Sequence, residues 1–508
     1  MTPTTWDGPM PEAITLGLDL GTGGCKAVAV DADGAALASA FAGYETTFPA
    51  NGWHEQRPDD WWDAVRTCCT ELSTRLDDGL AAVRAVGLSG QSLAPVLVDA
   101  QGQLARQTVP IWSDARATAQ ARRTMGELEE DAWYLRTGNG FPTELYTAFE
   151  IAWLAEHEPD VLDATTVVLG SKDWVNLRMT GRVATDRSYA SGSGVYDLAA
   201  RRYDHELVAA IGVPERLLPE IVDPTHVLGA VTADAASELG LPREAVVVAG
   251  GVDNACMALG AGLLADGDAY IALGSSNWIT LATREPVLDP TTRPFVFDHV
   301  VPGLYISALS TFGGGSSLAW LADVLHQDVA ELLRAAEDVP PGSAGLLCLP
   351  TLAGGTVLEG GSHVRGAFVG LDLAHGAGHL TRAVVEGIAL ALGRAAEALT
   401  RHTELPPALP TVGGGARSTL LLQALADVLD RTIVRRQGDA ESAAIGAAAL
   451  AAVGAGLKPD LGAAVAPAVT TGETAPTDEG RELHRELAAR HARVQSAIAA
   501  LHAPTQDA

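Results

Sequence analysis

The sequence is poor in cysteine and in positive charge. Its 508 residues include five cysteines, an odd number, and no two of them form a C-x-x-C pair. A disulfide framework or a zinc site is therefore not expected, and a reduced, cytoplasmic location fits best. The chain has 34 Lys and Arg against 63 Asp and Glu, which gives a formal net charge of -29. Nucleic acid and anionic membrane surfaces are disfavoured as partners, because both bind basic faces.

Targeting segments and long hydrophobic runs are also missing. Residues 1–13, MTPTTWDGPMPEA, have no basic stretch followed by an apolar one. We therefore expect no signal peptide, and we predict that these residues are disordered. The longest apolar suspect, residues 442–457, is mostly alanine and too short to span a bilayer.

Two common nucleotide-binding motifs are absent as well. The Walker motif G-x-x-x-x-G-K-[ST] does not occur in the sequence. The stretch from Gly260 to Ala265 comes near to the dinucleotide fingerprint, but it follows a helix-like segment instead of a strand. A dehydrogenase is therefore disfavoured.

The sequence does have a recurring pattern: a short apolar strand, then a glycine-rich turn, and in most cases a helix. It occurs near residues 19, 250, 274, 313 and 413. Such turns let backbone N–H groups approach an anion closely. Because the turns fall in both halves of the chain, we expect two similar domains that face a shared nucleotide, with a boundary near residues 262–268.

Strands and helices alternate, which predicts an α/β fold of two or more domains. The predicted strands are 14–20, its hairpin partner 26–30, 83–88, 245–249, 269–273, 305–310 and 410–412. The predicted helices are 58–80, 381–400, 418–430, 441–453 and 479–501.

Nine stretches, in order over residues 14–455, resemble the FGGY family of carbohydrate kinases, and within it the xylulose kinases most. They are LGLDLGTGGCK (16–26), GWHEQRPDDWW (52–62), GLSGQS (87–92), PIWSDAR (110–116), SKDWVNLRMTGRVATDRSYASGSGVYD (171–197), AGGVDNACMALGAG (249–262), LGSS (273–276), GGGARSTLLLQALADVL (413–429) and ESAAIGAAALA (441–451). The family shares a superfamily with hexokinase, glycerol kinase and actin.

The resemblance implies an α/β fold of two actin-like ATPase (ribonuclease H-like) domains with a catalytic cleft between them. It implies an N-terminal domain at 14–262 for the sugar and the first phosphate loop, a nucleotide-binding domain at 263–456, and a helical tail at 457–508. The implied reaction is ATP-dependent phosphorylation of a terminal hydroxyl of a small ketose or polyol, with Mg²⁺ and with D-xylulose as the first candidate. Ribulose, erythritol, glycerol or a deoxy sugar stay open as substrates, as do a homodimer and a non-catalytic actin-like protein that binds ATP or sugar.

Asp253 follows an apolar strand and two glycines, where an aspartate is often only a helix N-cap. The resemblance makes it the general base that takes the proton of the attacking hydroxyl. It also implies that Asp19 holds Mg²⁺, directly or through water. The implied ATP contacts are Gly21, Thr22, Gly23 and Gly24 in the first loop, Gly274, Ser275 and Ser276 in the second, Gly314, and then Gly414, Gly415 and Ala416, with Arg417 or Ser418 at the rim. The implied sugar contacts are Gln91, Ser92, Leu93, Asp253 and Asn254.

Some further residues have two interpretations. Lys26 either reaches a phosphate or is solvated in its hairpin strand. Three tryptophans either line the sugar pocket or belong to the core: Trp53, Trp112 and Trp278. Three histidines are too scattered in the sequence to form a metal-ligand pair: His54, His299 and His363.

The sequence departs from the xylulose kinases at two places. The family's Met-His-Gly is replaced by residues 92–94, Ser-Leu-Ala, so that Leu93 stands where a histidine would hydrogen-bond the sugar. The family's Pro-Tyr-Leu-x-Gly-Glu-Arg-x-Pro is replaced by residues 350–358, which lack the Glu-Arg pair. Both changes concern which sugar is bound, and neither touches Asp19, Asp253 or the phosphate loops.

Overall fold

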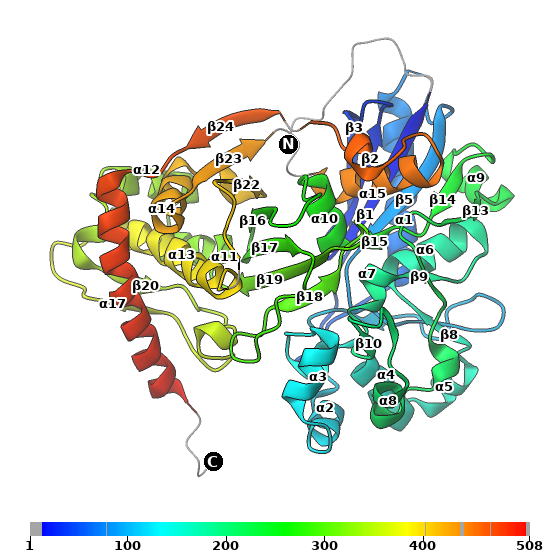
Figure 1. The fold of residues 1–508 in the computed structure, drawn as a ribbon, viewed down its shortest axis with the longest axis horizontal. Helices are drawn as coiled ribbons and strands as arrows, with labels where there is room; N and C mark the ends of the chain where they lie inside the picture. The colour runs from blue at the N-terminus through cyan, green and yellow to red at the C-terminus, as the bar shows by residue number, and fades with distance from the viewer. Residues whose placement is uncertain (1–12, 78, 402, 437–440, 468, 504–508) are drawn as a thin grey trace.

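The computed structural model of the chain describes residues 13–77, 79–401, 403–436, 441–467 and 469–503. The predicted disorder of residues 1–12 lies outside this part. Two seven-stranded mixed sheets form the centres of two halves of the molecule, which lie side by side in Figure 1.

The first sheet has the strand order β13-β14-β5-β1-β2-β3, with β15 paired to β5. Its strands are β1 (Ile14–Gly21), β2 (Gly24–Val30), β3 (Ala36–Gly43), β5 (Val83–Gly90), β13 (Val227–Ala230), β14 (Val246–Val248) and β15 (Gly251–Val252). Strands β1, β2 and β3 form an antiparallel meander, whereas β5 runs parallel to β1 and β14 runs parallel to β5. The predicted hairpin after the first strand is confirmed.

The second sheet has the order β18-β19-β17-β16-β22-β23-β24. Its strands are β16 (Ala269–Leu273), β17 (Asn277–Thr283), β18 (Phe295–Asp298), β19 (Tyr305–Thr311), β22 (Ala408–Val412), β23 (Thr432–Arg436) and β24 (Thr470–Thr474). Again an antiparallel meander, β16-β17-β19, is joined on one side by two parallel strands. Both sheets thus have ribonuclease H-like topology, which confirms the predicted pair of actin-like domains.

Helices cover both sheets; the predicted ones are present with shifted ends, and α12 was not predicted. The longer ones are α1 (Pro58–Arg75), α11 (Gly315–Leu325), α12 (Val329–Glu337), α13 (Ala377–Leu399), α14 (Thr419–Leu429) and α17 (Asp478–His502). Helix α1 begins at a proline, with two acids in its first turn, as expected for an N-terminus. Its predicted end at Leu80 is wrong, because Leu76 is already extended and yet buried in the core. Apolar periodicity therefore continued beyond the helix itself.

Two further helices lie between the sheets: α10 (Asp253–Gly260) and α15 (Ser442–Gly454). They touch through their backbones, because a Cβ added at Gly446 would lie 2.0 Å from the carbonyl oxygen of Cys256. In the sequence helix α15 comes between β23 and β24 of the second sheet, but it packs on the first sheet, where a Cβ at Gly17 would lie 1.8 Å from the Ala444 carbonyl oxygen. The alanine and glycine of this helix are thus required by close packing.

The first half also carries a group of small helices and strands, seen below the first sheet in Figure 1. They are β4 (Glu55–Gln56), β6 (Val96–Val98), β7 (Val109–Pro110), α2 (Thr118–Met125), α3 (Glu130–Thr137), α4 (Thr147–His157), α5 (Pro159–Ala164), β8 (Val167–Leu169), α6 (Ser171–Thr180), β9 (Thr185–Asp186), α7 (Arg187–Ala190) and α8 (His205–Ile211). Helices α6 and α7 contact the ends of β5 and β15. No helix in the described part of the chain has both the length and the apolar character needed to cross a membrane.

Candidate active site

Three parallel strands of the first sheet end at one edge and bring the predicted chemical residues together. In the registers of β1 with β5 and of β5 with β15, Asp19 lies beside Ser89, and Ser89 lies beside Gly251. Gln91 follows β5, and Asp253 follows β15. Residues far apart in the sequence therefore meet because the carboxyl ends of their strands share an edge.

Asp253 is the first residue of α10, whose N-cap is Val252. The interpretation of Asp253 as only an N-cap is therefore wrong. Its Oδ1 accepts a hydrogen bond from the Asn254 N–H at 2.8 Å. Burial, and then the negative charge of Asp19, raise the pKa of Asp253 to about 7. A carboxylate with a pKa near neutrality is a good proton acceptor, and a substantial fraction of it is still ionised at physiological pH.

Asp19 lies at the end of β1, and its Oδ1 accepts a hydrogen bond from the Ser89 hydroxyl at 2.7 Å. Burial raises the pKa of Asp19, while the Ser89 hydrogen bond and the charge of Lys26 act in the opposite direction. Lys26 is the cross-strand partner of Asp19 on β2. The lysine thus faces the same side of the sheet as the carboxylate, and its contact with phosphate stays a prediction.

The orientation of the Gln91 amide follows from a chain of donors. The Trp61 indole N–H, which can only donate, lies 2.9 Å from Gln56 Oε1. That oxygen also accepts from Gln91 Nε2 at 2.7 Å. Gln91 Oε1 is therefore the free end of the amide, and this buried oxygen has no partner among the described residues. It is an acceptor that a substrate hydroxyl would satisfy.

Gln56 also holds the first glycine loop, a role that the sequence reasoning missed. Its Nε2 donates to the Thr22 carbonyl oxygen at 2.7 Å. The Thr22 hydroxyl accepts from the Trp112 indole N–H at 2.9 Å, and the Gly21 carbonyl accepts from the Tyr44 hydroxyl. Thr22 and Gly23 are exposed. Trp112 therefore supports the loop. This role was not one of its two predicted alternatives, which were a wall of the sugar pocket and a place in the core.

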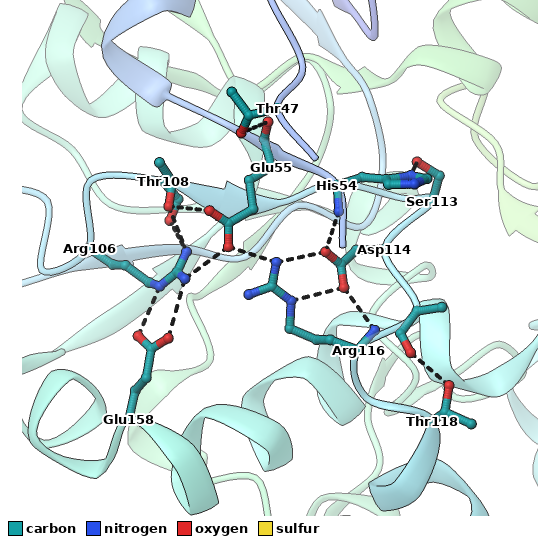
Figure 2. A network of polar contacts seen from close by, with 11 residues as sticks. Thr47, His54, Glu55, Arg106, Thr108, Ser113, Asp114, Arg116, Thr118 and Glu158 are labelled. Carbon is teal, nitrogen blue, oxygen red and sulfur yellow. Dashed lines mark hydrogen bonds and ion pairs between the residues drawn. The ribbon is translucent and has the colours of Figure 1, made fainter. Parts of the chain in front are cut away.

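Ionic contacts next to Gln56 fix its strand β4, as Figure 2 shows. Glu55 accepts hydrogen bonds from Thr108 at 2.6 Å and from Arg106 at 2.9 Å, and it pairs with Arg116 at 2.7 Å. Burial alone would raise the pKa of Glu55, but these partners outweigh it and the pKa lies below the usual value. The GWHEQ stretch belongs to one of the family motifs recognised in the sequence. Only the fold, however, shows what its Glu55 and Gln56 contact.

The other predicted sugar contacts follow the ends of the same strands, Ser92 and Leu93 after β5 and Asn254 after β15. Ser92 and Leu93 are buried, and Leu93 packs in an apolar cluster beside Gly192. Leu93 has a φ of 61°, in the left-handed region where histidine is enriched and leucine is uncommon. Asn254 is buried next to the general-base candidate, and its Oδ1 has no described partner.

Three glycine turns share one edge of the second sheet, because β16, β19 and β22 run in the same direction. The turn at Gly274, Ser275 and Ser276 is exposed, and the Gly315 N–H donates to the Gly274 carbonyl oxygen at 2.9 Å. A Cβ at Gly314 would lie 2.6 Å from the Ser275 carbonyl oxygen. The predicted ATP-binding segment 274–276 and the predicted ATP contact Gly314 therefore lie in direct backbone contact.

The third turn, residues 413–415, packs against the carboxyl end of β16. Gly413 has a φ of 94°, and its Cβ would lie 2.6 Å from the Leu273 carbonyl oxygen. Gly414 is exposed, whereas Ala416 is buried beneath the turn. Ser418 is the N-cap of α14, since its hydroxyl accepts from the Leu421 N–H at 3.3 Å.

The remaining candidates lie in the core or in polar networks. Trp53 stacks on the Arg116 guanidinium at 4.1 Å, and Trp278 packs against Phe295. His54 Nδ1 lies 2.6 Å from the Ser113 hydroxyl, and burial lowers the pKa of His299 to about 4. Among the described residues, no group of three or more His, Cys, Asp or Glu is placed to hold a metal ion.

Comparisons with known proteins agree with this geometry. Models of the N-terminal and C-terminal domains of the FGGY family of carbohydrate kinases match residues 14–260 and 269–455. The chain is 31% identical to a xylulose kinase of Lactococcus lactis over 83% of this chain and 84% of that protein.

Two solved structures superpose closely. A xylulose kinase from Rhodospirillum rubrum has a TM-score of 0.88 and 30% identity, covering 97% of this chain and 100% of that one. A gluconate kinase from Lactobacillus acidophilus has a TM-score of 0.90 and 25% identity, covering 96% and 99%. The chain therefore belongs to the FGGY family of carbohydrate kinases, which confirms the predicted family and its sugar-kinase activity.

Proposed function

We propose that this kinase phosphorylates a terminal hydroxyl of a small ketose or polyol, with D-xylulose as the first candidate. The observation that carries the proposal is the first sheet edge. There a carboxylate whose pKa is about 7, Asp253, lies beside Gln91 and Asn254, two buried amide residues whose oxygens have no partner in the described part of the chain. Hydroxyl groups of a polyol are the donors that such acceptors require.

In the proposed reaction Asp253 takes the proton of the attacking hydroxyl. The sugar oxygen forms a bond to the γ-phosphorus of ATP, and the bond from that phosphorus to the oxygen bridging it to the β-phosphate breaks to release ADP. The first loop at Thr22 and the second at Gly274–Ser276 would hold the phosphates through backbone N–H groups. The turn at 413–416 would lie against the adenosine.

Magnesium is proposed at Asp19. This ion is bound by one or two carboxylates together with substrate phosphates, and it needs no cage of protein ligands. Asp19 lies at the strand end beside the first loop, close enough to Asp253 for its charge to raise the pKa of that residue. When bound, the ion would neutralise charge on the transferring phosphate.

Xylulose is the first candidate because the curated relative and one of the two solved structures are xylulose kinases. The gluconate kinase has an equally close fold, so fold alone does not choose the sugar. Leu93 presents no polar atom, which favours a sugar with a missing hydroxyl, or with one held by another group, at the carbon that faces it. Ribulose, erythritol, glycerol and a deoxy sugar are therefore the alternatives.

A coupled assay of ADP release tests the proposal. Purified protein is given ATP, Mg²⁺ and, one at a time, D-xylulose, D-ribulose, gluconate, erythritol, glycerol and 1-deoxy-D-xylulose. We expect ADP release that depends on a ketose or polyol, with a phosphorylated product of matching mass. Release with gluconate alone would contradict the proposed substrate class. No release with any member would favour the alternative of a non-catalytic ATP- or sugar-binding protein.

A further inference from the structure

A fully buried cluster of charges lies beneath the turn that carries Asp253. Lys172 is 0% exposed, and its Nζ pairs with Asp173 and, at 2.9 Å, with Asp186. Removing three charges from water is costly, and a buried ion cluster is in general weak evidence for stability. These residues are outside the proposed catalytic and binding sets, so the cluster raises the question of what it holds.

Its contacts converge on residues 249–252, the turn before the general-base candidate. Lys172 Nζ donates to the Ala249 carbonyl oxygen at 3.1 Å. Asp186 Oδ2 accepts from both the N–H and the hydroxyl of Ser188. The Ser188 hydroxyl oxygen in turn accepts from the Val252 N–H at 3.0 Å. An unbroken series of contacts thus runs from the buried cation to the residue that precedes Asp253.

The first two residues of the turn have further partners: the Ala249 and Gly250 N–H groups donate to the carbonyl oxygens of His226 and Pro224 at 2.9 Å, and Asn176 Nδ2 donates to the Ala249 oxygen at 2.9 Å. The last two residues, next to Asp253, are held less firmly. Strand β15 has two residues, which pair with Ser89 and Gly90 of β5. Gly250 has a φ of 77°, and a Cβ there would lie 1.9 Å from the Leu88 carbonyl oxygen, so the backbone is tightly bent at this point. Such a short strand gains few ladder hydrogen bonds, so side-chain contacts carry much of its positioning.

Helices α6 and α7, which carry Lys172 and Ser188, also hold the sugar side of the site. The hydroxyl groups of Ser171 and Tyr189 donate to the Gln91 carbonyl oxygen at 2.9 and 2.8 Å. Ser171 neighbours Lys172 in the chain, and Tyr189 neighbours Ser188. The loop after β5 and the turn 249–252 are therefore both held by one pair of helices, α6 and α7.

We propose that Lys172, Asp186 and Ser188 are positioning residues for phosphoryl transfer, which hold the turn 249–252 so that the Asp253 carboxylate faces the bound hydroxyl. The inference rests on the proposed role of Asp253 as general base. It assigns a mechanistic purpose to the buried charges. If the buried charges served only the stability of the fold, breaking their contacts would not selectively lower turnover.

Ser188→Ala is the sharpest test, because it breaks the series of contacts without removing a charge. Ser343→Ala is a matched control: Ser343 is equally buried, and its hydroxyl donates at 3.0 Å to Glu386, which pairs with Arg382 in the other half of the molecule. Misplacement of a reacting group by about 1 Å can cost about 10²-fold. We expect Ser188→Ala to lower kcat for the best sugar of the panel by ~10–100-fold, with the KM for ATP unchanged, and Ser343→Ala to change neither.

A second measurement needs no substrate. In protein labelled with [γ-¹³C]aspartate, the Asp253 resonance is assigned by its loss in Asp253→Asn, and its titration midpoint is followed by NMR. Loosening of the turn should admit water and move this midpoint in Ser188→Ala towards the ordinary value for aspartate, whereas Ser343→Ala should keep the native midpoint. Ser188→Cys, which keeps an atom at the γ position but forms only weak hydrogen bonds, serves if Ser188→Ala fails to fold.

The outcomes separate the two proposals. If the native protein phosphorylates a sugar, kcat decides, and a kcat for Ser188→Ala equal to that of Ser343→Ala overturns the positioning role. If the native protein phosphorylates none of the panel, the proposed function fails and the midpoint decides. An Asp253 midpoint that is the same in Ser188→Ala and Ser343→Ala then overturns the positioning role as well.

Discussion

The two sheets have the same topology, but the edges that carry the site are built differently. At the first edge, side chains are fixed by other side chains: Ser89 donates to Asp19, and Gln56 accepts from Gln91. At the second edge, glycine turns are fixed by backbone contacts, such as that of Gly315 with Gly274. Under the proposed function, the first edge would serve proton transfer, the choice of sugar and one phosphate loop, and the second edge would hold the rest of the nucleotide.

This contrast separates the expected effects of substitution. Changes at the first edge should lower turnover or alter the choice of sugar, because they affect groups that act on the hydroxyl. Changes at the second edge should weaken nucleotide binding and leave saturated turnover nearly intact. Four predictions test this division.

The largest effect is expected for Asp253→Asn, which keeps the shape of the side chain but removes the proton acceptor. Turnover should fall by ~10²–10⁴-fold, the usual scale for loss of a general base, with nucleotide affinity little changed. Steady-state kinetics and calorimetry with an ATP analogue measure the two quantities. Asp99→Asn is the control, because Asp99 only accepts backbone N–H groups in a surface turn. Near-native turnover in Asp253→Asn would refute the assignment.

The pH dependence should show the same carboxylate. Burial and the charge of Asp19 raise the pKa of Asp253 to about 7, and the base acts only when it is ionised. Activity is therefore present above this pKa and lost as the pH falls through it, so that kcat/KM for the sugar should drop about tenfold per pH unit below 7. A profile that stays flat from about pH 8 down to about pH 5.5 would show that this carboxylate is not the titrating base.

The choice of sugar should depend on Leu93. Leu93→His introduces a ring that can hydrogen-bond a hydroxyl, at a backbone conformation that histidine adopts more readily. We expect kcat/KM to shift towards D-xylulose, relative to the best native substrate, by about tenfold, which corresponds to about 1.4 kcal/mol. Leu93→Met is the control of similar size. If the native protein already prefers D-xylulose and Leu93→His only impairs it, the idea of altered specificity fails.

The smallest effect is expected at the second edge. In Gly314→Ala the new methyl group would press on the Ser275 carbonyl oxygen and separate the stacked turns. The KM for ATP should rise roughly fivefold, about 1 kcal/mol, with kcat at saturating ATP unchanged. Gly376→Ala is the matched control, since a Cβ there meets no atom within 4 Å. A fall in kcat with an unchanged KM for ATP would contradict the division between the edges.

The sequence predicted the parts of the fold that have a local signal. Apolar runs bounded by glycine located β1, β5, β16 and β22, because a buried strand must be apolar and its turn must bend sharply. Strand β24 was missed, since its residues TTGET are polar and mostly exposed. Strand β15 was missed because two residues are too short to show a period.

The site was predictable only in part, for a similar reason. Asp19 and the glycine turns stand beside recognisable strands. Gln56 and Ser188 are single polar residues whose roles come from partners 35 and 64 positions away in the chain. No local pattern encodes such contacts, and only the fold brings the partners together. The packing of α15 on the first sheet could not be predicted from the sequence for the same reason.

The most direct test of the two-edge account is a crystal structure of Asp253→Asn with a non-hydrolysable ATP analogue and the preferred sugar. The account predicts that the phosphates lie between Thr22–Gly24 and Gly274–Ser276, with the adenosine against Gly414–Ala416. It also predicts that the terminal hydroxyl of the sugar faces residue 253, with another hydroxyl bonded to Gln91 Oε1. A nucleotide bound away from both glycine loops, or a sugar outside reach of residue 253, would contradict it.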